Sequence, residues 1–266
     1  MLKRTFKILT GVGARLERHL WREGILTWED FLTIGYISGI SKDRKYTFDR
    51  EIAKALYALD KGDIDYFTFR LPHTEYWRLF NAFRKDAVCL DIETMGGQAA
   101  EGEVTLIGMY GSGEMYTLIK DVNLDSRALS DILSQYKLII TYYGCTFDIP
   151  FLHKAIPGIN INMPNYDLCF ASHRLGIKGG LKKLEACFGI RRSDLIAGMN
   201  GYDAVKLWRR YMAGNKRALE LLIQYNEADT KNLYLLAEIL YNRLCKEFGP
   251  EIGKFEPQVT SFTSFP

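Results

Sequence analysis

Two acidic residues, Asp91 and Glu93, lie two positions apart within an otherwise apolar run, AVCLDIET, that begins at Ala87. If this run forms a strand, both carboxylates point to the same side, because side chains two positions apart share one face of a strand. A lone D-x-E pair more often marks a solvated strand end than a site. The pair therefore gains meaning only if further acids can join it.

Two further acids occupy positions from which they could do so. Asp148 follows the apolar run YKLIITYY through a glycine-containing turn and precedes Pro150, which is typical of the first turn of a helix. The competing interpretation of Asp148 is a helix N-cap. Asp229 lies four residues after Tyr225 in a long helical stretch, so the two side chains share one face. A solvated surface pair is the competing interpretation there.

Four carboxylates that lie close together repel one another and raise one another's pKa values unless cations compensate them. Hard oxygen ligands of this kind favour Mg²⁺ or Mn²⁺ over zinc. Two such ions about 3.5–4 Å apart can activate a water and stabilise both the attacking and the leaving oxygen of a phosphodiester. The four acids therefore predict a site for two divalent cations that supports phosphodiester hydrolysis.

The motif order is D-x-E, then F-D after a strand, then Y-x-x-x-D on a late helix, and it resembles the three exonuclease motifs of the DEDD superfamily. The stretches LDIETMGG, TYYGCTFDIPFL, YDLCFASHRLGIKGGLKKLEACFGI and YNEADTKNLYLL are similar to the YprB-type branch of ribonuclease H-like nucleases. The resemblance covers about residues 66–244. Tyr225 stands at the tyrosine position of the Tyr class, and Gln224, not His, lies five residues before Asp229. One position departs from the pattern, because Tyr143 stands where the second motif usually has Asn.

The resemblance implies a 3′→5′ exonuclease that releases 5′-mononucleotides from single-stranded ends. Asp91 is expected to bridge the two ions, with Glu93 and Asp229 on the ion that activates water. Asp148 is expected to act largely through the waters of the second ion. Tyr225 is expected to orient the bound water, since a phenol with an ordinary pKa of about 10 is a poor general base.

Two other functions remain open on the sequence. A structure-directed endonuclease could use the same metal site, and an inactive nucleic-acid-binding adaptor could keep the fold without the reaction. DNA is the preferred substrate hypothesis over RNA, although no motif specifies contacts to the 2′-OH that distinguish them.

The elements that would position these residues indicate an α/β fold. The runs AVCLDIET, EVTLIGMY, EMYTLI and YKLIITYY are rich in β-forming residues, and helical stretches lie between and after them. We expect a ribonuclease H-like mixed sheet flanked by helices over residues 87–245. A small helical unit is expected over residues 1–45, a helical linker or packing segment over 46–86, and a tail over 246–266.

The N-terminal unit could bind nucleic acid. Residues 1–22 carry six basic side chains against one acid. Gly11-Val12-Gly13 lies between basic helical segments and resembles a helix-hairpin-helix motif, in which backbone N–H groups contact a phosphate. Gly11, Gly13 and Arg15 are therefore candidate contacts, with an ordinary helix-helix turn as a nearly equal alternative.

Four further residues are candidate nucleic-acid contacts. Phe147 lies beside Asp148 and Tyr143 lies a few residues before it, and both could stack on bases, although an aromatic at position 147 is more often core. Strand alternation would place Tyr142 and Tyr143 on opposite sides, and we expect Tyr143 to face the substrate. Lys178 and Lys182 lie around a predicted helix start and could touch phosphates, with a solvated helix face as the alternative.

The overall composition adds little to this hypothesis. The chain has 35 basic and 32 acidic residues and a formal charge of +3, too mild to indicate a nucleic-acid binder alone. The five cysteines are widely spaced without a C-x-x-C pair, which predicts reduced thiols. No apolar run approaches the roughly 20 residues of a membrane span. We expect a cytoplasmic protein that binds no membrane, with its protein partners unspecified.

Overall fold

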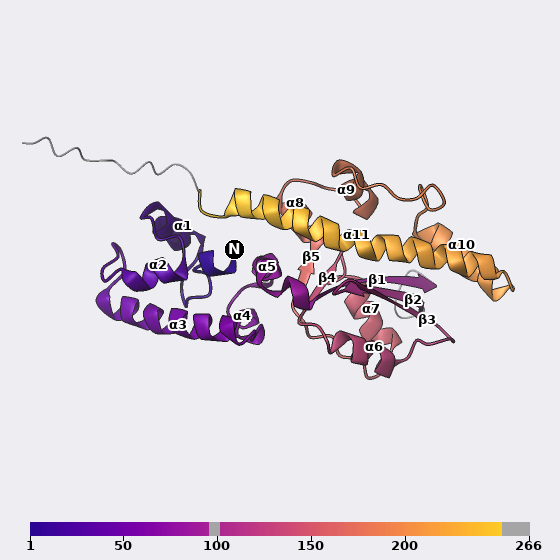
Figure 1. Ribbon diagram of the computed structural model, residues 1–266, viewed down its shortest axis with the longest axis horizontal. Helices are drawn as coiled ribbons and strands as arrows, with labels where there is room; N and C mark the ends of the chain where they lie inside the picture. Colours follow the sequence, from indigo (N-terminus) through magenta and orange to yellow (C-terminus); the bar gives the residue numbers. More distant parts are fainter. Residues whose placement is uncertain (96–101, 252–266) are drawn as a thin grey trace, which may run out of the picture.

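The computed structural model describes residues 1–95 and 102–251 of the chain. Its central feature is a five-stranded sheet in the order β3-β2-β1-β4-β5 (Figure 1). The strands have these bounds: β1 Ala87–Met95, β2 Glu103–Gly111, β3 Glu114–Ile119, β4 Leu138–Thr141 and β5 Asn165–Asp167. β2 is antiparallel to β1 and β3, whereas β4 is parallel to β1 and β5. The predicted α/β fold with a mixed sheet is confirmed.

Helices cover both faces of the sheet. α6 and α7 lie below it in Figure 1, and the 33-residue α11 crosses above it. The helices of this part have these bounds: α6 Ser126–Leu133, α7 Asp148–Ala155, α8 Leu168–Arg174, α9 Leu181–Cys187, α10 Gly201–Met212 and α11 Lys216–Phe248. Along β1, Val88 and Leu90 pack into the core on the α6 and α7 side, whereas Cys89 packs into the core on the α11 side. Cys89, Asp91 and Glu93 are spaced two residues apart along the strand, so their side chains share one face. Asp91 and Glu93 therefore face α11.

Helix α11 approaches the sheet closely at one glycine. Gly108 of β2 is paired with Asp91 of β1. A Cβ at this position would lie 2.0 Å from Asn226 Oδ1 and 2.5 Å from Thr230 Oγ1, both on α11. Any larger residue would therefore push the helix away from the strand that carries the acids.

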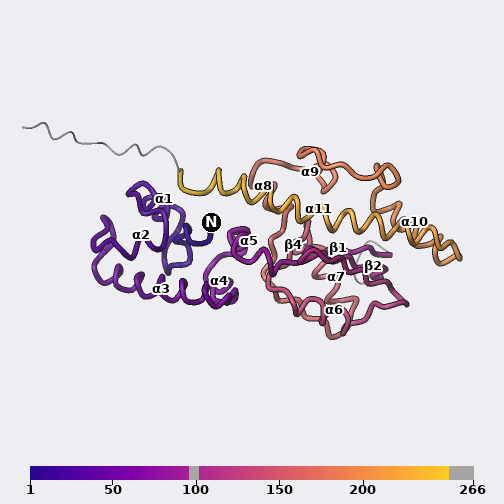
Figure 2. The backbone as a smooth tube through the Cα atoms, in the orientation of Figure 1, coloured from indigo at the N-terminus to yellow at the C-terminus, as the bar shows by residue number. Residues whose placement is uncertain are grey.

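The N-terminal helices form a unit beside the sheet (Figure 2). They have these bounds: α1 Ala14–Arg22, α2 Trp28–Thr33, α3 Lys42–Asp60, α4 Asp65–Thr68 and α5 Phe80–Phe83, with 3-10 helices at Leu2–Arg4, His73–Leu79 and Arg84–Asp86. Their core continues without interruption into the core beneath the C-terminal half of α11. The Met1 amino group also donates to Tyr241 Oη of α11 at 2.8 Å.

A buried ion network joins the N-terminal unit to the sheet domain. Glu75 accepts from Lys7 at 2.5 Å, from Arg78 at 2.6 Å and from Arg174 at 3.1 Å. Arg78 also lies 3.5 Å from Glu17. Burial raises the pKa of Glu75, but the charges of Arg78 and Lys7 outweigh it and lower the pKa to about 2. Residues 1–20, 70–80 and the end of α8 are thus held together by charges as well as by the core.

Several expectations about the elements need correction. The helical segment before the glycine hairpin is only the 3-10 helix Leu2–Arg4. Helix α3 crosses the boundary expected at residues 45 and 46, and α11 continues past residue 245 to Phe248. β5 was not expected from the sequence, because its three residues are too few to show a period. Residues 252–266, most of the expected tail, lie outside the described residues.

Two expectations from composition concern the cysteines and membranes. All five cysteines are free. None of the helices in residues 1–95 and 102–251 has both the length and the apolar character that crossing a bilayer requires.

Candidate metal centre

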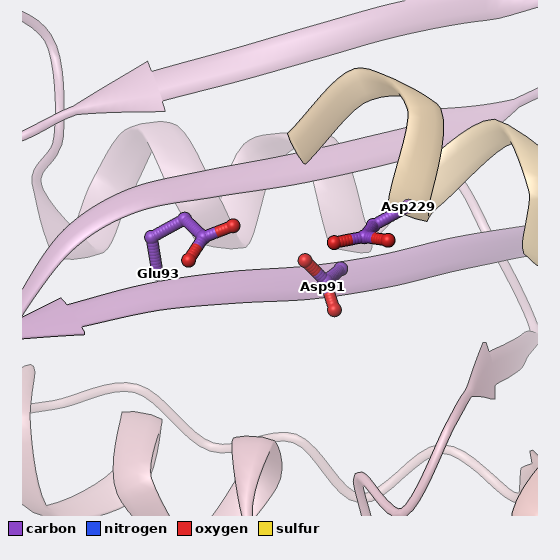
Figure 3. A group of neighbouring side chains, drawn as sticks. All are labelled: Asp91, Glu93 and Asp229. Atoms are coloured by element: carbon purple, nitrogen blue, oxygen red, sulfur yellow. The ribbon is translucent and has the colours of Figure 1, made fainter. Parts of the chain in front are cut away.

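Strand β1 and helix α11 bring three carboxylates together. Ligand oxygens of Asp91, Glu93 and Asp229 all lie within 4.8 Å of one another. Figure 3 shows Asp229 reaching down from α11 toward Asp91, with Glu93 further along the same strand. Glu93 and Asp229 are buried, and Asp91 keeps part of its surface open. The alternation predicted for D-x-E therefore directs both acids of β1 to the helix that carries the third.

Asp148 lies close to this cluster but outside the group of three. It is the first residue of α7 and is 6% exposed, and Phe147 is the N-cap. Its Oδ1 accepts a hydrogen bond from the backbone N–H of Ile92 in β1 at 3.3 Å. The helix N-cap interpretation of Asp148 is therefore wrong. Asp148 instead adds negative charge beside β1, at a position from which it raises the pKa values of both Asp91 and Glu93.

The positive charges near the four acids are too few to keep all of the carboxylates ionised. Removal from water, together with the charges of Asp229, Glu93 and Asp148, holds the pKa of Asp91 well above its usual range. Burial and the charge of Asp229 raise the pKa of Glu93 to about 8. Burial raises the pKa of Asp148 to about 7, against the opposing effect of its backbone hydrogen bonds. Such a cluster fits divalent cations, because bound cations would stabilise the ionised carboxylates and all the donors are hard oxygens.

Asn226 is a site residue that the sequence analysis missed. Its Nδ2 donates to Asp91 Oδ2 at 2.8 Å, and the residue is fully buried. Its Oδ1 is buried without a hydrogen-bond partner among the described residues. The signal was available, since Asn226 lies three residues before Asp229 on α11 and so shares a face with it. Asn226 therefore holds one of the candidate metal-ligand carboxylates, that of Asp91, in place.

Tyr225 lies in the same site and is held by a lysine. Lys182 Nζ donates to Tyr225 Oη at 2.8 Å and lies 4.5 Å from the centre of the ring. Lys182 also donates to the backbone carbonyl of Met199. Burial and the charges of Asp229 and Glu93 raise the pKa of Tyr225, so its hydroxyl keeps its proton and can donate it in a hydrogen bond. Of the two lysines expected to contact phosphates, Lys182 thus lies at the carboxylate site, whereas Lys178 is exposed.

Arg192 is the second site residue that no motif predicted. It lies in the irregular segment between α9 and α10, and its side chain is 6% exposed. Its Nη2 forms an ion pair with Asp229 Oδ1. Glu185 accepts from the same guanidinium at 2.8 Å from Nε and 2.7 Å from Nη2. Burial raises the pKa of Asp229, and the Arg192 charge opposes that rise.

Tyr142 and Tyr143 do not belong to a strand, so the predicted alternation of their side chains is wrong. β4 ends at Thr141, and Tyr143 lies in the following turn with φ +66°. Its N–H donates to Asp167 Oδ1 at 2.9 Å, which holds this left-handed conformation. Asparagine adopts that conformation more readily than most residues, which gives a backbone reason for the Asn of the resembled motif.

Three aromatic side chains near the second motif are open to solvent. Tyr143 is 46% exposed, and its ring centre lies 6.2 Å from that of Phe170, which is 51% exposed. Phe147 is 37% exposed and contacts Phe151 at 5.5 Å between ring centres. The interpretation of Tyr143 as a core residue is therefore wrong, and both expected stacking residues are accessible.

The glycine hairpin lies on the surface of the N-terminal unit. Gly11 has φ +74°, and its carbonyl accepts from Arg44 Nη2 at 3.0 Å. Gly13 is the N-cap of α1, and Arg15 is exposed in the first turn. Together with Phe69 the hairpin lines an open hollow. None of these residues belongs to the carboxylate cluster.

Solved structures with similarity to this chain have low sequence identity. A family B DNA polymerase from Pyrobaculum calidifontis is 17% identical and matches with a TM-score of 0.49 over 60% of this chain and 25% of its own. NrnC from Brucella melitensis, in a structure with bound Mg²⁺, is 21% identical, with a TM-score of 0.43 over 63% of this chain and 78% of its own. The Nibbler EXO domain from Aedes aegypti is 14% identical, with a TM-score of 0.46 over 66% of this chain and 88% of its own. The matched part of this chain spans about a quarter of the polymerase. No curated protein matches it.

A family model assigns this chain to a superfamily, which the similarity to these solved structures does not. The model of the RNase_H superfamily matches residues 88–241, which is more than half of the chain. The matched range begins in β1 and ends in α11, so it includes all four predicted carboxylates together with Tyr225, Asn226 and Arg192. The chain belongs to the RNase_H superfamily.

Proposed function

We propose that this chain is a divalent-metal-dependent 3′→5′ exonuclease of the Tyr class, which hydrolyses single-stranded nucleic acid to 5′-mononucleotides. The observation that carries the proposal is the group of Asp91, Glu93 and Asp229, whose oxygens lie within 4.8 Å of one another, with Asp148 beside them. Mg²⁺ or Mn²⁺ bound there would activate a water and stabilise negative charge on the phosphate oxygens.

The residues around the acids support distinct roles in this reaction. Asp91, Glu93 and Asp229 would hold the ions, with Asp148 acting mainly through bound water. Asn226 keeps the Asp91 carboxylate in place through its 2.8 Å hydrogen bond. Tyr225, kept protonated, offers its hydroxyl to orient the attacking water, and Lys182 holds that hydroxyl. A phenol in this state can donate a hydrogen bond but cannot serve as a general base at neutral pH.

The substrate would reach the site across exposed aromatic and basic side chains. We assign base stacking to Tyr143 and Phe147, since stacking on aromatic rings is how proteins bind single strands without reading sequence. Lys178 would contact the phosphate backbone close to the site. Gly11, Gly13 and Arg15 would contact it further away, and the open N-terminus of α1, which has no side-chain cap, supports this. DNA remains the preferred substrate over RNA.

The test is degradation of single-stranded DNA and RNA labelled at the 5′ or the 3′ end, side by side with Mg²⁺, Mn²⁺ or EDTA. The proposal expects immediate release of labelled mononucleotide from 3′-labelled strands and a descending ladder from 5′-labelled strands. Internal fragments that appear first would assign the site to an endonuclease. Binding without any cleavage, under every metal condition, would assign the chain to the inactive adaptor class.

A further inference from the structure

The ion pair between Arg192 and Asp229 places a guanidinium on a carboxylate that the proposed function gives to a metal ion. Arg192 Nη2 contacts Asp229 Oδ1 directly, and both side chains are buried, at 6% and 8% exposed. Asp229 is one of the three residues whose oxygens gather within 4.8 Å. One of the carboxylates suited to a cation is therefore already paired with a cation of the chain itself.

Arg192 is held in that place by a second acid. Glu185, 3% exposed, accepts two hydrogen bonds from Nε and Nη2 at 2.8 and 2.7 Å, the side-on geometry that favours a bidentate pair. Asn232 of α11 donates to Glu185 Oε1 at 2.8 Å and fixes the acid in turn. Glu185 belongs to α9 and Asp229 to α11, so the guanidinium joins these two helices across the edge of the site.

The arrangement leaves one nitrogen of the Arg192 guanidinium without a hydrogen bond to the described part of the chain. Its Nη1 is buried and has no hydrogen-bond partner among the described residues. Its backbone belongs to the segment between α9 and α10, which forms neither helix nor strand around residue 192. A guanidinium with an unused donor on an irregular segment can exchange partners at lower cost than one that is fully bonded on a helix.

We propose that Arg192 is a built-in counter-cation of the carboxylate cluster, which holds Asp229 in the metal-free protein and must release it when a divalent ion binds. This inference rests on the proposed metal centre. Arg192 is then a positioning residue that sets metal affinity, because each binding event replaces an internal ion pair. It gives the buried acids a partner before metal arrives and makes the affinity for the ion weaker than the carboxylates alone would provide.

The test is a Mn²⁺ titration of the full-length, metal-free protein by calorimetry, without nucleic acid. Arg192→Gln should tighten the dissociation constant by about tenfold or more, since a unit charge beside a buried ligand is removed. The matched control is Arg191→Gln, which removes the same charge from the adjacent, exposed residue and should change the constant by less than about threefold at physiological salt. In EDTA, Arg192→Gln should unfold at a lower temperature than the wild type, and Mn²⁺ should raise that temperature by more.

Arg192→Lys provides a second variant in case Arg192→Gln does not fold. Lysine keeps the charge but lacks the planar fork that contacts Glu185 and Asp229 together, so the constant should tighten by a smaller factor. Unchanged or weaker Mn²⁺ binding in both variants, or an equal shift in Arg191→Gln, would overturn the inference while leaving the metal centre in place. If no form of the protein binds Mn²⁺, the proposed function fails together with the inference.

Discussion

Asn226 shows how much of this site depends on a residue that is not itself an expected ligand. Its amide holds Asp91 Oδ2 at 2.8 Å, and Asp91 is one of the proposed metal ligands. Partners that orient metal ligands are usually worth about 10–100-fold in affinity or activity. We expect Asn226→Ala to lower kcat by that range in a nuclease assay at saturating Mg²⁺. The exposed neighbour Gln224→Ala is the control and should keep full activity, and equal losses in both variants would contradict the positioning role.

The site residues divide into those that a sequence can reveal and those that it cannot. Asp91 and Glu93 were predictable, because side chains two residues apart in a strand point to the same side. Asp229 was predictable because it shares one face of the helix with Tyr225. Arg192 was not, since it lies in an irregular segment where no period constrains the direction of a side chain. Its ion pair with Asp229 depends on how α9 and α11 meet, which is a property of the tertiary structure alone.

At the scale of elements, the contact between β2 and α11 positions Asp229. Gly108 lets the helix approach, because a Cβ there would lie only 2.0 Å from Asn226 Oδ1. Gly108→Ala should therefore destabilise the fold by about 1–3 kcal/mol, as overpacked cores do, and reduce activity further by moving Asp229 away from Asp91. Urea unfolding and nuclease rates on the same samples measure both effects. Gly201→Ala, at the start of α10 where an added Cβ would meet no atom within 4 Å, is the control and should change neither.

Long, strongly patterned elements were predicted well, whereas the three-residue β5 was missed and the end of β4 was misplaced. β1, β2, β3 and α11 follow runs whose period covers several residues. β4 stops at Thr141, two residues earlier than the run YKLIITYY indicates, because Asp167 of β5 captures the N–H groups of Tyr143 and Cys145 and turns the chain. That contact is made across 22 to 24 residues of sequence, so local propensity could not indicate it.

At the scale of the whole molecule, the buried acids predict how stability depends on pH. In the metal-free protein the pKa values of Glu93 and Asp148 are raised to about 8 and about 7, from 4.5 and 3.8. The folded state therefore binds more protons than the unfolded state between about pH 4 and pH 8. The stability that these groups contribute is fully present below the pKa values they have in the unfolded state. It is lost as the pH rises through the pKa values they have in the folded state.

We accordingly expect the unfolding temperature in EDTA to fall as the pH is raised from about 5 to about 8. Mn²⁺ should reduce or reverse this fall, because bound cations favour the ionised carboxylates. Scanning fluorimetry across that range, with EDTA or Mn²⁺, measures both curves. A metal-free curve that rises over the same interval would contradict the raised pKa values.

The shared core changes how the N-terminal unit can be tested. Deleting residues 1–40 would expose the core beneath α11 and remove partners of Glu75, so a loss of binding would not be specific. Arg15→Gln with Arg18→Gln removes exposed charge from α1 without touching the core. If both residues contact phosphates, the slope of log affinity against log salt should fall by about 0.7 per lost contact on single strands, or about 1.4 in all.

The control for this prediction is the double variant Arg127→Gln with Lys154→Gln. It removes the same amount of charge from α6 and α7, which cover the face of the sheet opposite α11 (Figure 1). Fluorescence anisotropy with a labelled oligonucleotide at several salt concentrations gives both slopes. Equal slopes for the two double variants and the wild type would show that α1 does not contact the substrate.

We have proposed that Asp91, Glu93, Asp148 and Asp229 form a metal centre that hydrolyses phosphodiesters. The most direct measurement is the rate at which purified wild type and Asp91→Asn release mononucleotide from single-stranded DNA, with Mg²⁺, with Mn²⁺ and with EDTA. We predict turnover in the wild type with either metal, none in EDTA, and a loss of more than about 100-fold in Asp91→Asn, which exceeds the usual effect of a residue that only supports a ligand. Asp91→Asn should remain folded and be at least as stable as the wild type in EDTA, because it removes charge from a crowded cluster. Turnover that persists in EDTA, or an Asp91→Asn variant that keeps the wild-type rate, would contradict a metal centre at these four acids.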